Sequence, residues 1–399
     1  MSLIWHIVLG RHDRIGTASP SPFVRFVGIA VLAVYSVTGF ADLFGASVVP
    51  AADKGSGPNE PKYRLEALDG GVVLRHGGGP QQCDYRGARD VWVWESGGTY
   101  YMHYDGAGPK GWLACLATST NLTHWIKKGP VLDLGTAGSD DSASASYGTT
   151  YWDGATWHMF YLGTPNATPA PNRIPAPPYL TMEARSDSPG GPWVKQPDII
   201  PFRPANIPAA CYGASSAVVA SPGMIVKSRG DYLMFVSAGG FSAGNNQAPY
   251  GNITIARTKN LEGKWTFDGA PMLPWSETCE NSSLYFEPAN QTWFLFCNHI
   301  HVNFTDAIWV YWTKDLNHWN SSDKAVVLDG SNCRWSRSCI GQPSVVKVGG
   351  RLAVFYDAPG GDSASHMNRD VGLAWLDLPL QLPVPFKDST AGPAANRAP

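Results

Sequence analysis

A short strand pattern recurs five times along the 399-residue chain, at a spacing of about 60 residues. The copies read TYYMHYDG from Thr99, TWHMFYLG from Thr156, DYLMFVSA from Asp231, TWFLFCNH from Thr292 and RLAVFYDA from Arg351. A shorter apolar strand precedes each copy, and a third strand follows it at a variable distance. Four of the five units end on a tryptophan, at positions 125, 193, 265 and 319. Repeats at this spacing indicate an array of similar units and exclude a single sandwich.

The repeated units match the blades of a β-propeller, because short alternating strands joined by turns are typical of that architecture. A blade cannot bury both of its faces alone, so it packs on its neighbours, and the blade-end tryptophans are expected to fill that space. The chain is also rich in Gly (43), Pro (32) and Trp (16), as expected of an all-β protein with many turns. We therefore predict an all-β, five-bladed β-propeller over residues 63–385. Residues 60–85 are expected to supply the missing outer strand of the last blade.

The positions just before the first strand of each unit are the candidate site positions, because inner strands line the axis of a propeller and their ends converge. These positions carry, in chain order, Asp90, the pair Asp140 and Asp141, Ser221, Glu280 and Gln342. Two carboxyl groups that face one pocket are the minimum apparatus for cleaving a glycosidic bond. One must be protonated to release the leaving oxygen, and the other must be ionised to activate water or attack the anomeric carbon. The alternative is that each acid is an ordinary solvated loop residue.

At this point the chain resembles the five-bladed propeller superfamily of arabinanases, β-xylosidases, invertases and levansucrases, above all glycoside hydrolase family 43. The resemblance covers roughly residues 85–378. It is carried by Asp90 with WVWESGGTYYMHY, by LATSTNLTHW, and by ENSSLYFEPANQTWFLF around Glu280. The resemblance implies that Asp90 is the general base of an inverting enzyme or the nucleophile of a retaining one, and that Glu280 is the general acid. It implies no required cofactor.

The chain departs from the family at a third carboxylate, which orients the acid and tunes its pKa. Its place reads ASPGMIVK, so Ser221 stands where an Asp is expected. Either Asp141 takes over this role or the activity differs from the family norm. The residues expected to bind substrate are Arg89, Trp92, Ser221, His299, Gln342 and His366. The resemblance also links a fifth-blade His such as His366 to an axial calcium or water site, so a structural calcium is the one metal considered.

These features predict a monomeric glycoside hydrolase that acts on a polysaccharide or oligosaccharide. Two other functions stay open: a non-catalytic carbohydrate-binding propeller that lost the third acid, and a relative that transfers the sugar to an acceptor other than water. Nucleic acid is not an expected partner, because the net charge is −2 and no basic run is present.

The first fifty residues predict export. Residues 26–44 read FVGIAVLAVYSVTGFADLF and follow Arg11, Arg14 and Arg25, a pattern typical of a signal peptide or an uncleaved signal-anchor over residues 1–51. A buried helix is the alternative. Residues 52–62 are expected to be a linker, and residues 386–399 a disordered tail. The protein is thus expected to be secreted, or anchored in a membrane with the propeller outside.

Two further sequence features bear on that compartment. Sequons for N-glycosylation occur at Asn121, Asn166, Asn252, Asn281, Asn290, Asn303 and Asn320. We expect Asn281 to be unused, since a glycan beside Glu280 would obstruct the pocket. The seven cysteines are too scattered for a disulfide scaffold, but Cys333 and Cys339 flank a short loop and could pair in an oxidising compartment.

Overall fold

The computed structural model describes residues 60–211, 217–241, 250–300 and 306–383. The predicted signal segment and tail and most of the predicted linker lie outside these residues. The described part is almost entirely β-structure. Its only helices are single 3-10 turns, and none of them is long and apolar enough to cross a membrane. They are η1 (Pro80–Gln82), η2 (Pro204–Asn206), η3 (Ala209–Cys211) and η4 (Trp275–Glu277).

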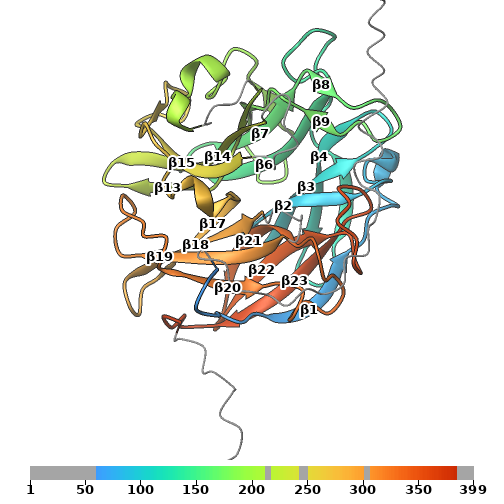
Figure 1. Cartoon of the computed structure of the whole chain (residues 1–399). Coiled ribbons are helices and arrows are strands. Elements are labelled where there is room, and N and C mark those ends of the chain that lie inside the picture. Colours follow the sequence, from blue (N-terminus) through green and yellow to red (C-terminus); the bar gives the residue numbers. More distant parts are fainter. Residues whose placement is uncertain (1–59, 212–216, 242–249, 301–305, 384–399) are drawn as a thin grey trace, which may run out of the picture. The chain divides into compact units, whose positions relative to one another are not determined.

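Five antiparallel blades account for the strands (Figure 1). Blade 1 consists of β2 (Ala88–Ser96), β3 (Thr99–Ala107), β4 (Trp112–Ser119) and β5 (Ile126–Pro130). Blade 2 consists of β6 (Ser144–Trp152), β7 (Trp157–Thr164), β10 (Leu180–Ser186) and β11 (Val194–Lys195). A small extra hairpin, β8 (Asn166–Ala167) and β9 (Pro175–Ala176), is inserted between β7 and β10.

The remaining three blades follow the same order. Blade 3 consists of β12 (Ala217–Ser221), β13 (Ile225–Ser228), β14 (Asp231–Phe241), β15 (Tyr250–Thr258) and β16 (Thr266–Phe267). Blade 4 consists of β17 (Cys279–Glu287), β18 (Thr292–His299), β19 (Ala307–Thr313) and β20 (Lys324–Leu328). Blade 5 consists of β21 (Gly341–Val348), β22 (Arg351–Ala358), β23 (Asp370–Asp377) and β1 (Leu68–Leu74). The predicted five-bladed propeller is confirmed.

The ring is closed by β1, the first strand of the described chain. It pairs antiparallel with β23, the last strand, and Leu68 lies opposite Trp375. The prediction that residues 60–85 complete the last blade is therefore confirmed. Figure 1 shows β1 beside β23 at the outer edge of this blade.

The blade-end tryptophans lie between blades, as predicted. Each packs edge-on against a ring in the second strand of the preceding blade. The four pairs, with their centroid separations, are Trp125 with Phe355 (5.8 Å), Trp193 with His103 (5.6 Å), Trp265 with Phe160 (5.8 Å) and Trp319 with Phe235 (6.2 Å). One aromatic contact is thus repeated at four of the blade junctions.

A buried acid recurs near the outer strand of three blades, where it accepts hydrogen bonds from a tyrosine hydroxyl and a lysine ammonium. We call each set an acid–Tyr–Lys triad. The triads are Asp84 with Tyr104 and Lys127, Asp141 with Tyr161 and Lys195, and Glu277 with Tyr311 and Lys324. Because each lysine comes from the outermost strand of its blade, the triad ties that strand to the strands inside it.

Candidate active site

A β-bulge marks the start of the inner strand in four blades. One residue in each bulge has a positive φ, namely Asp90 (51°), Tyr147 (44°), Asn281 (54°) and Gln342 (37°). Such bulges re-aim a side chain and are common beside active sites. They also correct one detail of the sequence comparison. Glu280 precedes its bulge residue, so its register equivalent in blade 1 is Arg89, and Asp90 is equivalent to Asn281.

Asp90 is held as an ion pair at the start of β2. Arg89 contacts both of its carboxylate oxygens, at 2.8 Å through Nε and 3.2 Å through Nη2. The backbone N–H of Asp90 donates to Oδ2 of Asp357 in blade 5, at 2.8 Å. About one sixth of the surface of the Asp90 side chain stays exposed. Two-point pairing with a guanidinium fixes the orientation of a carboxylate.

Glu280 lies in a different electrostatic environment. Its side chain is half-buried, and its Oε1 accepts a hydrogen bond from Nδ2 of Asn298 at 3.3 Å. Burial, together with the negative charges of Asp306 and Asp90, raises the pKa of Glu280 from 4.5 to about 7. The positive charge of Arg89 and the Asn298 hydrogen bond oppose this shift without cancelling it. Glu280 can therefore hold a proton near neutral pH.

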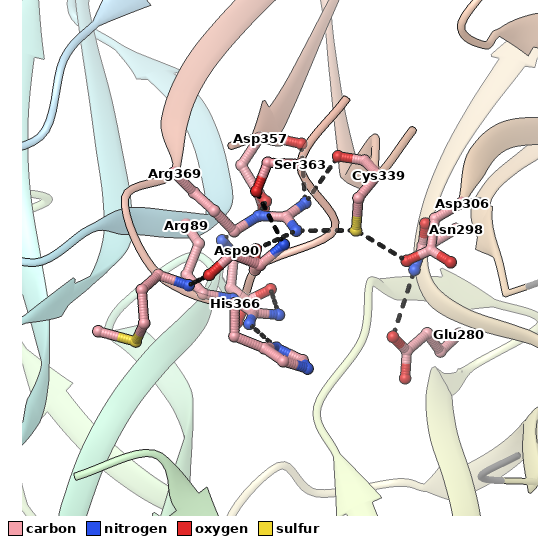
Figure 2. A network of polar contacts seen from close by, with 12 residues as sticks. Arg89, Asp90, Glu280, Asn298, Asp306, Cys339, Asp357, Ser363, His366 and Arg369 are labelled. Atoms are coloured by element: carbon pink, nitrogen blue, oxygen red, sulfur yellow. Dashed lines mark hydrogen bonds and ion pairs between the residues drawn. The ribbon is translucent and has the colours of Figure 1, made fainter. Parts of the chain in front are cut away.

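Residues of blade 5 hold the backbone of Asp90 in place through hydrogen bonds and an ion pair (Figure 2). Buried Arg369 forms an ion pair with Asp357, the acceptor of the Asp90 N–H, and also donates to the backbone oxygen of Asp357 at 3.0 Å. On the open side, Nη1 of Arg89 lies 2.6 Å from Nδ1 of His366. Because a guanidinium can only donate, Nδ1 of His366 accepts this hydrogen bond and carries no proton.

Four residues of this network lie outside the positions before the inner strands, and of these the sequence had suggested only Asp357, as a possible pocket or turn residue. Asp105, Asn298 and Asp357 occupy the seventh position of the repeated second strand, opposite Arg89, Glu280 and Gly341 respectively. A polar residue at this position in four of the five copies, with Ser237 as the fourth, was the available signal. Asp306 precedes β19 and belongs to no repeat.

The extra hairpin of blade 2 lies near Arg89, to which it is connected through Trp112. Trp112 lies under the guanidinium of Arg89, 5.4 Å from its ring centroid, and donates from Nε1 to the backbone oxygen of Asn172 at 2.9 Å. The hydroxyl of Tyr179 donates to the oxygen of Pro175 at 2.8 Å. Burial raises the pKa of Tyr179, whose hydroxyl is also within electrostatic range of Arg89 and Glu280. The hairpin thus forms one side of the site.

Comparison with solved structures places this geometry in a known fold. A protein solved as a BT0996 RGII complex is 15% identical with a TM-score of 0.62, over 80% of the present sequence and 95% of its own. The catalytic domain of the Coprinopsis cinerea GH62 α-L-arabinofuranosidase is 12% identical with a TM-score of 0.55, over 79% and 98%. A thermostable family-43 glycoside hydrolase is 15% identical with a TM-score of 0.50, over 81% and 97%. The protein has the five-bladed β-propeller fold of these glycoside hydrolases. No protein-family model and no curated protein matches it.

The predicted resemblance to this glycoside hydrolase fold is confirmed for the fold, but Asp141 lies elsewhere in the propeller. Its side chain is 5% exposed and belongs to the blade 2 triad, with the Tyr161 hydroxyl at 2.9 Å and the Lys195 ammonium at 2.5 Å. The structure does not bring it together with Asp90 and Glu280. The acids near the starts of the inner strands fall into two groups. Asp90 and Glu280 belong to the site, whereas Asp141, like Asp84 and Glu277, belongs to an acid–Tyr–Lys triad.

We therefore expect Asp141→Asn to weaken the fold and not the chemistry. The change removes a charge-assisted partner of Lys195, so the free energy of unfolding should fall by about 1–3 kcal/mol. Urea denaturation measures this loss, and kcat/KM of the folded variant should stay within a few-fold of wild type. A variant that is fully stable but inactive would return Asp141 to the catalytic residues.

The other predicted substrate-binding residues differ in their surroundings. Trp92 is buried with Trp94 and Leu116, so it fills a core and offers no exposed ring to a sugar. His299 stacks on Trp309, with ring centroids 3.5 Å apart. Gln342 is buried at its bulge, and its side chain interacts with the hydroxyl of Tyr147.

Ser221 ends β12 opposite Ser237, in the register position of Arg89 and Glu280. It therefore lies at the corresponding end of the blade 3 inner strand, but without a charge. Of the predicted residues, Arg89 is bound directly to Asp90 by an ion pair. His366 is connected to Asp90 indirectly, through its hydrogen bond with Arg89.

All seven cysteines lie in the described residues, and all are free thiols. The conditional prediction of a Cys333–Cys339 disulfide is not met. Sγ of Cys333 lies 3.5 Å from the Tyr356 hydroxyl, whereas Sγ of Cys339 contacts Asp306 at 3.4 Å and Arg369 at 3.0 Å. The two thiols thus serve different polar networks.

The described residues contain no group of three or more His, Cys, Asp or Glu side chains that could hold a metal ion. Two acids of the network that contains His366 are instead paired with guanidinium groups, Asp90 with Arg89 and Asp357 with Arg369. The axial calcium suggested by the family resemblance gains no support from this arrangement. Asn281 is buried, and its N–H donates to Ser237 Oγ at 2.6 Å, so the idea that its sequon is unused stays a prediction.

Proposed function

We propose that the protein is a glycoside hydrolase that cleaves a polysaccharide or oligosaccharide, with Glu280 as general acid and Asp90 as general base or nucleophile. One observation carries this proposal: two carboxyl groups with opposite environments share one site. Glu280 has a pKa raised to about 7, whereas Asp90 is locked in an ion pair with Arg89. Such a division of environments assigns an acid and a base.

The proposed reaction follows from these two states. Protonated Glu280 donates its proton to the glycosidic oxygen as the bond to the anomeric carbon breaks, so the leaving group departs as a neutral alcohol. Ionised Asp90 then either removes a proton from the attacking water or attacks the anomeric carbon itself. In the second case water later hydrolyses the glycosyl ester, and Glu280 acts as the base. Arg89 keeps Asp90 oriented.

The class of substrate is supported by the fold. The similar solved proteins are named as a GH62 α-L-arabinofuranosidase and a family-43 glycoside hydrolase, and another was solved as an RGII complex. A sugar-binding propeller without catalysis is the second candidate, favoured by the uncharged Ser221. Calorimetric binding of an oligosaccharide without any turnover would favour that candidate.

The pH dependence tests the role of Glu280. Because the general acid must be protonated, and the pKa of Glu280 is about 7, kcat/KM should fall as the pH rises through about 7. Initial rates on an oligosaccharide between pH 4 and 10 measure this alkaline limb. A rate that stays constant from pH 6 to 9 would contradict the assignment.

A further inference from the structure

A second carboxyl group accompanies Glu280 in blade 4. Figure 2 shows Asp306 and Asn298 together beside Glu280. Nδ2 of Asn298 donates to Oε1 of Glu280 at 3.3 Å, and the polar side chain of Asn298 also favours the anion of Asp306. One amide therefore influences both carboxyl groups. The backbone oxygen of Asp306 accepts from the N–H of Ile340 at 3.2 Å, which holds this residue against blade 5.

The charges around Asp306 and around Glu280 differ: mainly positive groups surround Asp306, and mainly negative groups surround Glu280. Asp306 accepts from the Cys339 thiol at 3.4 Å and lies in the positive field of Arg369 and Arg89. Arg369 donates to Cys339 Sγ at 3.0 Å, so the guanidinium and Asp306 contact the same buried thiol. Among the described residues, the titratable and charged groups that face Glu280 are Asp306, Asp90, Arg89 and Tyr179.

Asp306 raises the pKa of Glu280 through its negative charge, and the charge of such a pair settles on the member with the better-stabilised anion. Burial raises the pKa of Asp306, but Arg369 and the Cys339 hydrogen bond oppose that rise. Glu280 has two acids as neighbours, and Asp306 contributes more than Asp90 to its raised pKa. The Cys339 thiol that donates to Asp306, and the Arg369 guanidinium beside that thiol, favour the anion on Asp306 over the anion on Glu280.

We propose that Asp306 is a positioning residue that carries the negative charge of this pair and thereby keeps the proton on Glu280. Its catalytic consequence rests on the function proposed above. In this protein the acid that supports Glu280 thus comes from the segment before β19 of the same blade. Blade 3, where the sequence comparison expected an acid, contributes uncharged Ser221.

The test measures the protonation of Glu280 directly and does not require activity. Infrared spectra of the full-length protein labelled with ¹³C-glutamate are recorded across the pH range, and the Glu280→Gln spectrum is subtracted to isolate the Glu280 carboxyl band. In Asp306→Asn the midpoint of Glu280 should fall by about one unit or more, because a like charge has been removed. The alkaline limb of kcat/KM should move down by the same amount.

Matched variants separate this effect from a structural one. Asp306→Glu should keep the wild-type midpoint, and Ser221→Ala should leave it unchanged. Should Asp306→Asn not fold, Asp306→Ala serves as a second neutral variant with no polar side chain to satisfy. An unchanged Glu280 midpoint in either folded neutral variant would overturn the inference.

The two possible failures are distinguishable. If no sugar is turned over, the proposed function fails, while the infrared titration still decides whether Asp306 controls Glu280. If the wild type is active and its alkaline limb is unmoved in Asp306→Asn, only the role of Asp306 is lost.

Discussion

Replacing Glu280 by Gln is expected to lower kcat/KM by about 10²–10⁴-fold on a natural oligosaccharide, the usual contribution of a general acid. The alcohol that leaves from such a substrate needs a proton, and glutamine cannot donate one. On a dinitrophenyl glycoside the loss should be much smaller, because that phenolate leaves without protonation. Parallel assays of both substrates on one protein preparation measure the difference.

Asp90→Asn is the matched variant. It removes the base or nucleophile, which both substrates need, so its loss should be equally large on the two of them. Asp141→Asn serves as a control that removes a carboxylate of the blade 2 triad, away from the site, and should keep most of the activity. Activity on oligosaccharides that survives both Glu280→Gln and Asp90→Asn would sink the proposed mechanism.

Lys324→Met is expected to cause the largest loss of stability among simple changes outside the site. Glu277 is 2% exposed, and its Oε2 accepts from the Lys324 ammonium and the Tyr311 hydroxyl, each at 2.6 Å. Removing the lysine leaves a buried carboxylate without its counter-ion, which typically costs about 3–5 kcal/mol. Urea denaturation of the purified variant, followed by tryptophan fluorescence, measures the free energy of unfolding.

The double variant Glu277→Gln/Lys324→Met controls for the change in packing. With both charges removed, most of the stability should return, because the cost arises from an unpaired buried charge. A single variant as stable as wild type would show that the blade 4 triad does not stabilise the blade.

The sequence predicted the propeller because its signal is repeated. Five strand patterns and four tryptophans at blade ends are hard to satisfy with another fold, and the inter-blade contacts of Trp125 and Trp265 follow the prediction. Asp90 and Glu280 were found for the same reason, since both lie at the start of an inner strand. Their one-residue offset was not visible, because a bulge adds a residue without changing the polar pattern around it.

The remaining errors have physical causes. Asp141 and Asp90 both stand before an inner strand, and only the distant partners Lys195 and Tyr161 reveal that Asp141 belongs to a triad. Asp306 stands just before β19 and is held by contacts with Cys339 and Ile340, which come from a different part of the sequence. Such contacts between segments that are not repeated leave no periodic trace.

The pairing of β1 with β23 governs when this protein can finish folding. Leu68 and Trp375 are about 300 residues apart in the sequence, so this contact closes a very long loop and forms only after β23 has been synthesised. Until then β1 has no partner strand, and a protein shortened past Leu74 would leave β23 as an exposed edge that invites aggregation. Expression variants that remove the N-terminal segment should therefore keep the residues from Tyr63 onward, whose backbone also bonds to Val326 of blade 4.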